Sequence, residues 1–250
     1  MSKRSFYIMF MLAVWAALAS SFAQAAPAFR LGGNGTLNDI SAHEYLEVWN
    51  DESKTTSIET LLKIDPHFED YNFEKLKGAG FSNSIYWLRF KVMNTDKAAQ
   101  TIYLKATDPQ QYLDFYSLDA DGKTVADSQK LGSFRPISLQ RLTYRFPVME
   151  INTKPGLNTY VLRMNILSVT FPYRFWTKNE LLEKSRSDQV VLAFLFGSFF
   201  IMALYNVLLG ITTHSVEYFL YCGYLTLFIV LQLFLTGAGR LYFNESWALL

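Results

Sequence analysis

The chain has 250 residues, a formal net charge of +1 and a hydrophobic fraction of 50%. This balance excludes the strongly basic and strongly acidic classes, so no overall field points to nucleic acid as a partner. The charge is unevenly distributed, because residues 30–188 hold nearly all of it and residues 190–235 hold one formal charge, Glu217. That break in composition predicts the main domain boundary.

The first 25 residues have the parts of a secretory signal peptide. Lys3 and Arg4 form a basic start, FYIMFMLAVWAALA is a short apolar run, and an A-Q-A cleavage site ends at residue 25. We therefore expect residues 1–25 to be a signal peptide and the next segment to be exported. The alternative is an uncleaved N-terminal anchor, which exports the same residues.

Residues 30–178 are predicted to form a β-sandwich domain. In SIYWLRFKV, Tyr86, Leu88 and Phe90 point to one face, whereas Trp87 and Arg89 point to the other. Similar alternation and turn chemistry predict further strands in TIYLKAT, YLDFYSL, RLTYRFPV, TYVLRMNI and SVTFPYRFW. With no helical stretch between these strands, the pattern predicts an all-β antiparallel sandwich or jelly roll.

Two shorter segments precede the clear strands. SIETLL is compatible with a short helical turn, and FEKLKGAG with a loop. The exported domain has no disulfide, because the one cysteine of the chain, Cys222, lies in a later apolar segment. A domain of this length can bury enough apolar surface to fold without one.

Motifs of catalysis and metal binding are missing from this domain. His43-Glu44 is not followed by a second histidine at zinc-helix spacing, and no serine lies in a G-x-S-x-G elbow. The carboxylates of Asp119 and Asp121 lack the other oxygen ligands of a calcium loop, so a hairpin turn ending at Gly122 is the better interpretation. We therefore expect no catalytic residue, metal or cofactor here.

A ligand-binding surface is the functional hypothesis for the domain. Cationic and aromatic side chains suit a sugar ring or the carboxylate of an acidic metabolite. The residues predicted to form this surface are Trp87, Arg89, Arg135, Tyr144 and Arg145. In the structural alternative, Trp87 fills the interior of the sandwich and Arg89 pairs with a local carboxylate.

Two apolar segments are long enough to cross a bilayer. Residues 190–211 contain no formal charge and span about 33 Å as a helix, and residues 218–235 span about 27 Å. The short TTHSVE link makes them antiparallel neighbours. Residues 179–189 are predicted to be a juxtamembrane linker, and residues 236–250 the start of the next loop. A buried hairpin in a soluble protein is the alternative.

Two signals conflict about the orientation of the chain. Lys178, Lys184 and Arg186 precede the first span and the link has no Lys or Arg, so the positive-inside rule places the β domain in the cytoplasm. The signal peptide places it outside. Long domains are exported largely regardless of flanking charge, so we place residues 26–188 in the periplasm and the link in the cytoplasm.

The two predicted spans contain polar groups that do not suit lipid. The amides of Asn206 and Gln232 are expected to face another helix and to form hydrogen bonds there. Gly197 and Gly223 are the small residues that would let helices approach closely. Two spans shield such groups poorly, so the sequence predicts packing against further helices.

The segment FLFGSFFIMALYNVLLGITTHSVEYFLYCGYLTLFIVLQLFLTGAGRLYF resembles the start of the seven-helix module of bacterial receptors with diverse intracellular signalling modules. Within this segment, the resemblance is carried by Gly197, Tyr205-Asn206, Tyr218, Tyr221, Gly237 and Gly239. GFSNSIYWLRFKVMN and GSFRPISLQRLTYRFPV are similar to the W-L-R-F and R-P-I segments of that family's type-2 extracellular region. The resemblance covers roughly residues 45–250.

The resemblance implies an architecture that goes beyond the chain itself. It comprises a signal peptide, a periplasmic β domain like carbohydrate-binding jelly rolls, seven helices and a cytoplasmic kinase or cyclase in cis. The expected partners are a small molecule, membrane lipid and a second copy of the chain, in the bacterial inner membrane. The chain ends at Leu250 after two predicted spans, so we expect a fragment or a truncated product. Its link also lacks the basic residues common in the family.

The sequence therefore predicts a receptor's ligand-sensing periplasmic and membrane portion, without catalytic activity of its own. The first alternative is an anchored binding or adhesion module that uses its helices only as a tether. The second is a membrane enzyme that acts on envelope glycans or lipids. Asn206 and Gln232 favour the receptor, since a tether has no need of buried amides.

Overall fold

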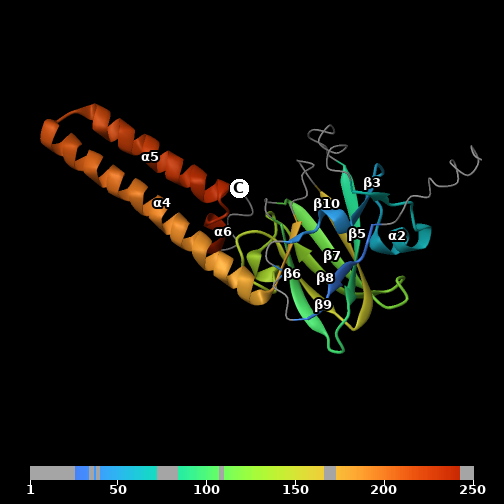
Figure 1. Cartoon of the computed structure of the whole chain (residues 1–250). Helices are drawn as coiled ribbons and strands as arrows, with labels where there is room; N and C mark the ends of the chain where they lie inside the picture. The colour runs from blue at the N-terminus through green and yellow to red at the C-terminus, as the bar shows by residue number, and fades with distance from the viewer. Residues whose placement is uncertain are drawn as a thin grey trace, which may run out of the picture.

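The computed structural model describes residues 26–33, 37, 40–71, 84–106, 110–165 and 173–242. In these residues the chain forms a β sandwich followed by a long helical hairpin (Figure 1). The predicted signal peptide, the predicted FEKLKGAG loop and residues 243–250 lie outside the described part.

The sandwich consists of two sheets. The larger has the order β4-β3-β5-β10-β7-β8, with β1 parallel to β5 beyond the end of β3. Its strands are β1 (Phe29–Leu31), β3 (Leu46–Asp51), β4 (Glu69–Asp70), β5 (Ile85–Asn94), β7 (Tyr112–Leu118), β8 (Val125–Leu131) and β10 (Gly156–Asn165). The smaller has the order β2-β11-β6-β9, from β2 (Ile40–Ser41), β6 (Gln100–Ala106), β9 (Val148–Thr153) and β11 (Tyr173–Trp176).

The alternation in β5 has the predicted consequence. Leu88, Phe90 and the other residues of that parity lie in the core between the two sheets. Tyr160 on β10 stacks between Phe90 and Phe115, with ring centroids 5.2 and 5.7 Å away. Its hydroxyl donates to the Asn152 carbonyl of the opposite sheet at 3.0 Å, and burial raises the pKa of this phenol. The core therefore ties the sheets together by packing and by a polar contact.

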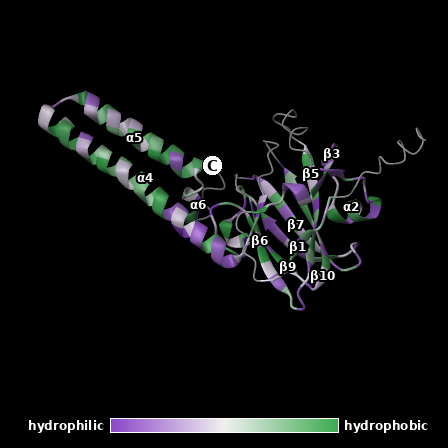
Figure 2. Cartoon of the chain, viewed as in Figure 1, coloured by the Kyte–Doolittle hydropathy of each residue, from purple (hydrophilic) through white to green (hydrophobic). Residues whose placement is uncertain are grey.

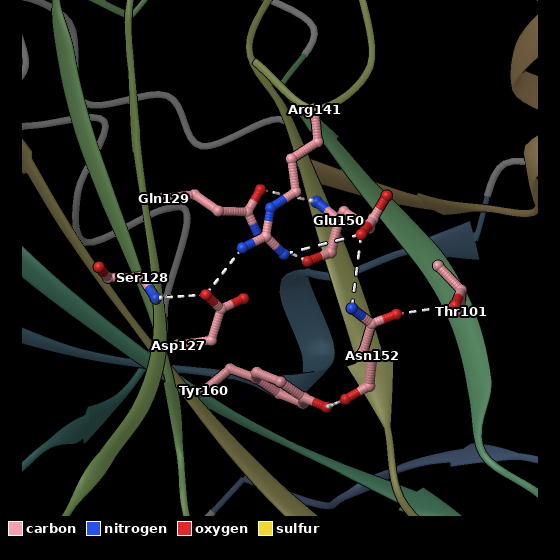
Figure 3. A network of polar contacts seen from close by, with 8 residues as sticks. All are labelled: Thr101, Asp127, Ser128, Gln129, Arg141, Glu150, Asn152 and Tyr160. Atoms are coloured by element: carbon pink, nitrogen blue, oxygen red, sulfur yellow. Dashed lines mark hydrogen bonds and ion pairs between the residues drawn. The ribbon is translucent and has the colours of Figure 1, made fainter. Parts of the chain in front are cut away.

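One side of the sandwich is closed by side chains rather than by a strand ladder (Figure 3). Gln129 on β8 donates to the Glu150 carbonyl on β9 at 2.6 Å and accepts from the Glu150 amide at 3.2 Å. Arg141 lies between the carboxylates of Asp127, at 2.7 Å, and Glu150, at 3.6 Å. Two sheet edges that would otherwise be open are thereby joined.

The prediction of a strand in RLTYRFPV is wrong except at its last residue. The segment has no regular structure until β9 begins at Val148, which follows a proline that cannot donate to a ladder. Tyr144 instead packs against Trp176 and Leu181 in a cluster of its own. An alternation of polar and apolar residues arises here from docking onto a helix, not from a sheet.

The prediction of a turn at SIETLL is correct, and the turn is helix α2 (Ile58–Ile64). Ser57 caps it by accepting a hydrogen bond from the Thr60 amide at 3.3 Å. Ile58 and Leu61 are buried against the outer face of the larger sheet, together with Trp87 and Val161. In Figure 1, α2 lies on the far side of the sandwich from the long helices. Short 3₁₀ turns, η1 (His43–Tyr45) and η2 (Ile137–Leu139), complete the domain.

Residues 179–189, which were predicted to be a juxtamembrane linker, are helical in the structure. Helix α4 (Lys178–Thr213) runs without a break from the β domain through the first predicted span. Thr177 and Glu180 form a capping box, with the Thr177 amide donating to the Glu180 carboxylate at 2.9 Å. At 36 residues the helix is about 54 Å long, more than a bilayer needs. In Figure 2 the excess is the hydrophilic end beside the sandwich.

The second predicted span is helix α5 (Val216–Leu235), which returns along α4 to the β domain. It is followed by one short turn of helix, α6 (Gly239–Tyr242). Phe199 and Phe228 meet edge to face at 5.2 Å between the two long helices. Both helices are long and apolar enough to cross a membrane, and few of their apolar side chains are buried in the structure.

Candidate functional site

Two features of the sandwich gather charged side chains, and they lie on opposite sides of it. The first is a groove of about 810 Å³ on the outer face of the larger sheet, referred to below as the outer groove. α2 forms one wall, the β7–β8 hairpin forms the other, and β5 and β10 form the floor. Its lining includes Lys63, Phe68, Arg89, Lys91, Asp121, Lys123, Thr159 and Val161.

Local sequence fixes both walls of the outer groove. α2 is capped at its C-terminal end by Asp65, which adopts the left-handed conformation with φ 38° and donates its amide to the Leu61 carbonyl. The hairpin turns through Gly122, with φ 67°, where a side chain would be strained. Asp121 holds this turn by accepting from the amides of Lys123 and Thr124 at 2.9 and 3.0 Å. The predicted hairpin is therefore correct.

Arg89 is the predicted ligand residue that lines the outer groove. Its Nε donates to the buried carboxylate of Glu47 on β3 at 2.5 Å, and its Nη1 lies 3.4 Å from Asp65, the residue that caps α2. The guanidinium lies 4.2 Å from the centre of the Phe68 ring. Arg89 thus pairs with local carboxylates, as the structural alternative predicted, and fixes the position of the α2 wall relative to β5.

The structure corrects the prediction for Trp87. Its side chain is 0% exposed, so the ring is not available to a ligand at the surface. It stacks on Tyr116 with centroids 6.2 Å apart and packs with Ile58 and Leu61 of α2. The alternation placed Trp87 on the outer face of the sheet, but that face is covered here by a helix. Trp87 supports the outer groove from beneath.

The second feature is the junction between the sandwich and α4. Asp188, on the hydrophilic end of α4, accepts from Arg145 at 2.7 Å and from the Tyr144 hydroxyl at 3.3 Å. Lys184, one turn earlier on the helix, lies 3.2 Å from the same carboxylate. A space of only about 20 Å³ remains beside these groups, enough for about one water. The junction is a closed contact and not a pocket.

Burial dominates the electrostatics of Tyr144. The side chain is 3% exposed, and burial, followed by the nearby Asp188 charge, raises its pKa to about 12. The phenol therefore stays neutral and donates to Asp188 at every physiological pH. Lys105 lies 5.0 Å over the Tyr144 ring and 5.4 Å over Trp176, which adds a cation–π contact to the packing.

The end of α5 is held to the same part of the sandwich by α6. Arg240 donates to the carbonyls of Gly132, Arg135 and Arg145 at 2.9, 3.1 and 3.3 Å. Burial lowers the pKa of this guanidinium. The backbone at Gly237 (φ 68°) lies close to the Arg145 carbonyl, which a Cβ added there would approach to 3.2 Å. Both long helices are thus attached to one segment of the sandwich, residues 132–145 between β8 and β9.

Arg135 extends this attachment into the larger sheet. Its guanidinium pairs with Asp114 on β7 at 2.5 Å and also donates to the carbonyls of Leu113 and Leu131. Asp114 in turn lies 3.7 Å from Arg163 on β10. Charged side chains therefore form a row from Arg163 through Asp114 to Arg135, whose backbone carbonyl accepts from Arg240. Arg163 lies on β10 two residues beyond Val161, which lines the outer groove.

The polar and small residues predicted for the spans have mixed outcomes. Asn206 donates to the Met202 carbonyl of its own helix at 2.8 Å, not to a neighbouring helix. Gly197 and Gly223 lie against open space among the described residues, so they do not bring α4 and α5 together. That role belongs to Gly210, where an added Cβ would come within 2.9 Å of the Phe219 ring.

Across the described residues, the backbone carbonyl of Gln232 accepts a hydrogen bond from the Thr236 hydroxyl, and the Gln232 side chain forms none. The contacts between α4 and α5 are supplied by other groups. The Tyr221 hydroxyl reaches the sulfur of Met202 at 3.4 Å, and the Cys222 thiol reaches the Ala203 carbonyl at 3.3 Å. The predicted interhelical bonds of the two amides thus have no counterpart within this pair of helices.

The structure does not bring the five predicted ligand residues together. Arg89 lines the outer groove, Trp87 lies beneath it, and the other three belong to the junction. Sequence reasoning missed Asp188 and Arg240. Asp188 is the last charge before a long uncharged run, and Arg240 is the first charge after the second span, and that position at the two membrane boundaries was the available signal.

Two family models match the chain. Residues 43–177 match the model described as 7TMR-DISM extracellular 2, and residues 188–250 match the one described as 7TM diverse intracellular signalling. The chain belongs to the 7TMR-DISM receptor family. In this receptor the first matched region ends at Thr177, the cap of α4, and the second begins at Asp188, in the junction. It is a membrane protein with a periplasmic β domain, and both matched modules are sensory.

None of the curated proteins matches the receptor. Solved structures that the chain matches include a tail fiber protein, gp63.1, from a phage of E. coli, at 8% identity and TM-score 0.34, which covers 61% of this chain and 20% of that one. A putative β-galactosidase from Bacteroides fragilis has 9% identity and TM-score 0.31, over 56% and 22% of the two chains. A β-glucosidase from Kluyveromyces marxianus in complex with glucose has 11% identity and TM-score 0.28, over 62% and 17%.

This receptor thus spans about a fifth of the length of these solved chains. The similarity is too low for the activities of these proteins to be transferred to it.

Proposed function

We propose that this chain is the sensing and membrane-coupling portion of a bacterial inner-membrane receptor. A small molecule binds the outer groove of the periplasmic sandwich. The junction passes the resulting change to α4 and α5, and a cytoplasmic kinase or cyclase in cis reads it. The observation that carries the proposal is the attachment of both helices, through Asp188 and Arg240, to one segment of the sandwich.

Helical continuity supports transmission across the membrane. The capping box starts α4 one residue after β11 ends, and Leu181 in its first turn is fully buried. A displacement of the sandwich therefore moves a helix that continues for 36 residues without a flexible joint. A ligand can bias the helices only by its differential affinity for two arrangements, and a stiff connection keeps that difference from being lost in slack.

The row of charged groups between the outer groove and the junction supports a signal that passes from the groove to the junction. Arg163 on β10 lies near the outer groove, and Arg135 presents its carbonyl to Arg240. Asp114 pairs with both arginines. A shift of β10 on ligand binding would alter these pairs first. Contiguity alone does not prove coupling, so Asp114 is a position to test.

A membrane-tethered adhesion module is the alternative function. Such a module requires only the two spans and a flexible connection to its binding domain. The ion pairs, the cation–π contact and the Arg240 contacts of the junction go beyond that requirement. These contacts favour the receptor over the tether.

The test measures whether the junction sets the position of the sandwich on the helices. Spin labels at Lys130, an exposed position on β8, and at Thr213, in a Cys222→Ala background, would report one narrow distance distribution in lipid nanodiscs. A Gly/Ser insertion after Leu182 should broaden this distribution strongly, whereas the same insertion in the exposed β9–β10 turn should not broaden it beyond the label's own motion. An unchanged distribution after the Leu182 insertion would contradict the proposal.

The same insertion also separates receptor from tether in the intact protein with its cytoplasmic domain. For a receptor, the insertion after Leu182 disconnects output from stimulus while ligand binding to the sandwich is retained. For a tether, neither the insertion nor removal of the sandwich changes any cytoplasmic activity. Stimulated output that survives the insertion at wild-type level would also refute transmission through α4.

A further inference from the structure

The acidic groups of the outer groove already have partners. Asp121 accepts three hydrogen bonds from its own turn, including one from the Thr124 hydroxyl at 2.6 Å. Asp65 lies 3.4 Å from Arg89, and the Ser57 hydroxyl bonds to Glu59 and lowers the pKa of that carboxyl. These carboxylates hold the walls of the groove in place and have little need of a further cation.

The basic groups of the outer groove are in the opposite condition. Within the part of the chain that the structure describes, the ammonium groups of Lys63, Lys91 and Lys123 form no hydrogen bond and no ion pair, although Lys63 is attracted to the Glu59 carboxylate and Lys123 to that of Asp121. They come from three different elements, α2, β5 and the β7–β8 hairpin, and all line the same groove. Lys91 has no comparable carboxylate partner among the described residues, and like charges that line one groove repel each other, so an anion placed there would be attracted.

The remainder of the lining is apolar and well supported. Phe68 and Val161 are buried in the apolar cluster that packs α2 onto the larger sheet, and Leu62 and Val125 pack against that cluster. Thr159, directly opposite Lys91 in the β5–β10 ladder, adds a hydroxyl to the floor. At about 810 Å³, the groove has the size of sites that hold small organic ligands.

We propose that the outer groove selects an organic carboxylate with an apolar or ring-shaped body. The ammonium of Lys91, with those of Lys63 and Lys123, holds the carboxylate, and the apolar part of the lining covers the body. The proposal deepens the proposed sensory function, since it names the ligand class of the groove. Glu59 and Asp121 on the walls oppose a large polyanion, so a single carboxylate on a compact body fits better than a chain of charges.

The experiment uses pairs of probes that differ only in the carboxylate. D-glucuronate is compared with D-glucose, and phenylacetate with phenylacetamide, by calorimetric titration of the full chain in nanodiscs. At least one carboxylate is expected to bind at least about tenfold more tightly than its neutral partner, and its affinity should fall as salt is raised. If neither carboxylate binds at millimolar concentration, or if the neutral partners bind equally well, the proposal is wrong.

Variants decide whether binding takes place in the outer groove. Lys91→Gln should weaken the carboxylate about tenfold, and Lys91→Arg should restore most of the loss because it restores the charge. Lys130, an exposed lysine on β8 that does not line the groove, provides the matched control Lys130→Gln, which should bind as the wild type does. Equal binding by Lys91→Gln and the wild type would overturn the proposal. Thermal unfolding of each variant checks that the fold is intact.

This result is independent of the test of transmission. The spin-label distances report the junction without any ligand, and the titration reports the outer groove without any signal. A receptor whose groove prefers neutral ligands would fail the second test and pass the first. A carboxylate-binding tether would do the reverse.

Discussion

The outer groove and the junction contain similar residues but satisfy them differently. In the groove, about 810 Å³ remains open, and three lysines form no hydrogen bond and no ion pair among the described residues. In the junction, about 20 Å³ remains, and Asp188 alone is contacted by Arg145, Tyr144 and Lys184. An ammonium without a partner next to open space suits an incoming ligand, whereas a fully contacted carboxylate in a closed space suits a fixed connection. The number of charges at a surface therefore says less about its role than the way in which those charges are paired.

The largest effect is expected when the outer groove loses the side chain of Trp87, which supports it from beneath. Trp87→Ala should destabilise the sandwich by about 3–5 kcal/mol, because a large buried ring is replaced by a cavity. Denaturant unfolding followed by circular dichroism measures this loss. Trp87→Phe keeps most of the buried area and should lose far less stability. If Trp87→Ala unfolded like the wild type and lost ligand binding alone, Trp87 would be a ligand residue after all.

The next effect concerns the ion pair that closes the junction. Arg145→Met and Asp188→Asn should each cost about 2 kcal/mol, because each leaves a poorly solvated charged group without its partner. The double variant should cost less than the sum, with a coupling energy of about 1–2 kcal/mol. Unfolding of the sandwich in nanodiscs, followed by tryptophan fluorescence, measures these differences.

A matched control for that pair lies on the β9–β10 turn. Lys154 and Asp119 are 3.7 Å apart and well exposed. Their coupling energy in the same kind of double-variant cycle should be below about 1 kcal/mol, since water screens exposed pairs. If the two pairs gave equal coupling, the junction would be no more than an ordinary surface contact.

A smaller effect is expected from alkaline pH. The pKa of Tyr144 is raised from 10.0 to about 12 in the fold, so the unfolded chain loses this proton first as the pH rises. The contribution of Tyr144 to stability is therefore fully present below pH 10 and is lost between pH 10 and about 12. The loss from pH 10 to pH 11 should approach about 1 kcal/mol.

Tyr144→Phe isolates this contribution from those of the other tyrosines. The difference in unfolding free energy between the wild type and Tyr144→Phe should shrink as the pH rises through this window. A difference that stays constant from pH 9 to pH 11.5 would mean that the phenol is not shielded in the junction.

The smallest expected effect tests whether the junction continues into the helical hairpin. Gly210→Ala would place a Cβ against the Phe219 ring and should weaken the pairing of α4 and α5 by about 1 kcal/mol, since the ring can partly move away. Gly197→Ala meets open space and should be neutral or slightly stabilising, because alanine is the better helix former. Thermal unfolding in detergent compares the two variants. Equal effects would show that the hairpin observed here is not held by this contact.

Much of the fold could be predicted from the sequence because its signals are local. The alternation in β5, the turn residues of the β7–β8 hairpin and the capping serine of α2 each depend on a few neighbouring residues. The error at RLTYRFPV has a physical reason. Tyr144 and Val148 face α4, which follows more than 30 residues later, and docking onto it imitates a strand pattern.

The candidate site was less predictable because pairing is a property of tertiary contacts. The residues next to Arg89 in the sequence do not indicate that it will form ion pairs with Glu47 and Asp65. Those next to Lys91 do not indicate that it will stay unpaired. Gly197 and Gly210 are equally small in the sequence, yet only Gly210 faces the neighbouring helix closely. The spacing of such residues shows where contact is allowed and not where it occurs.

By itself the sequence determined the β class of the domain, the two membrane helices and the family, since strand alternation, span length and ordered motifs are properties of neighbouring residues. The tertiary structure alone decided which charges are paired, that Trp87 lies beneath a groove, and that Asp188 and Arg240 hold both helices to one loop. The physical reason is that a charged or aromatic side chain acquires its role from what surrounds it. Those surroundings come from segments up to about a hundred residues away along the chain.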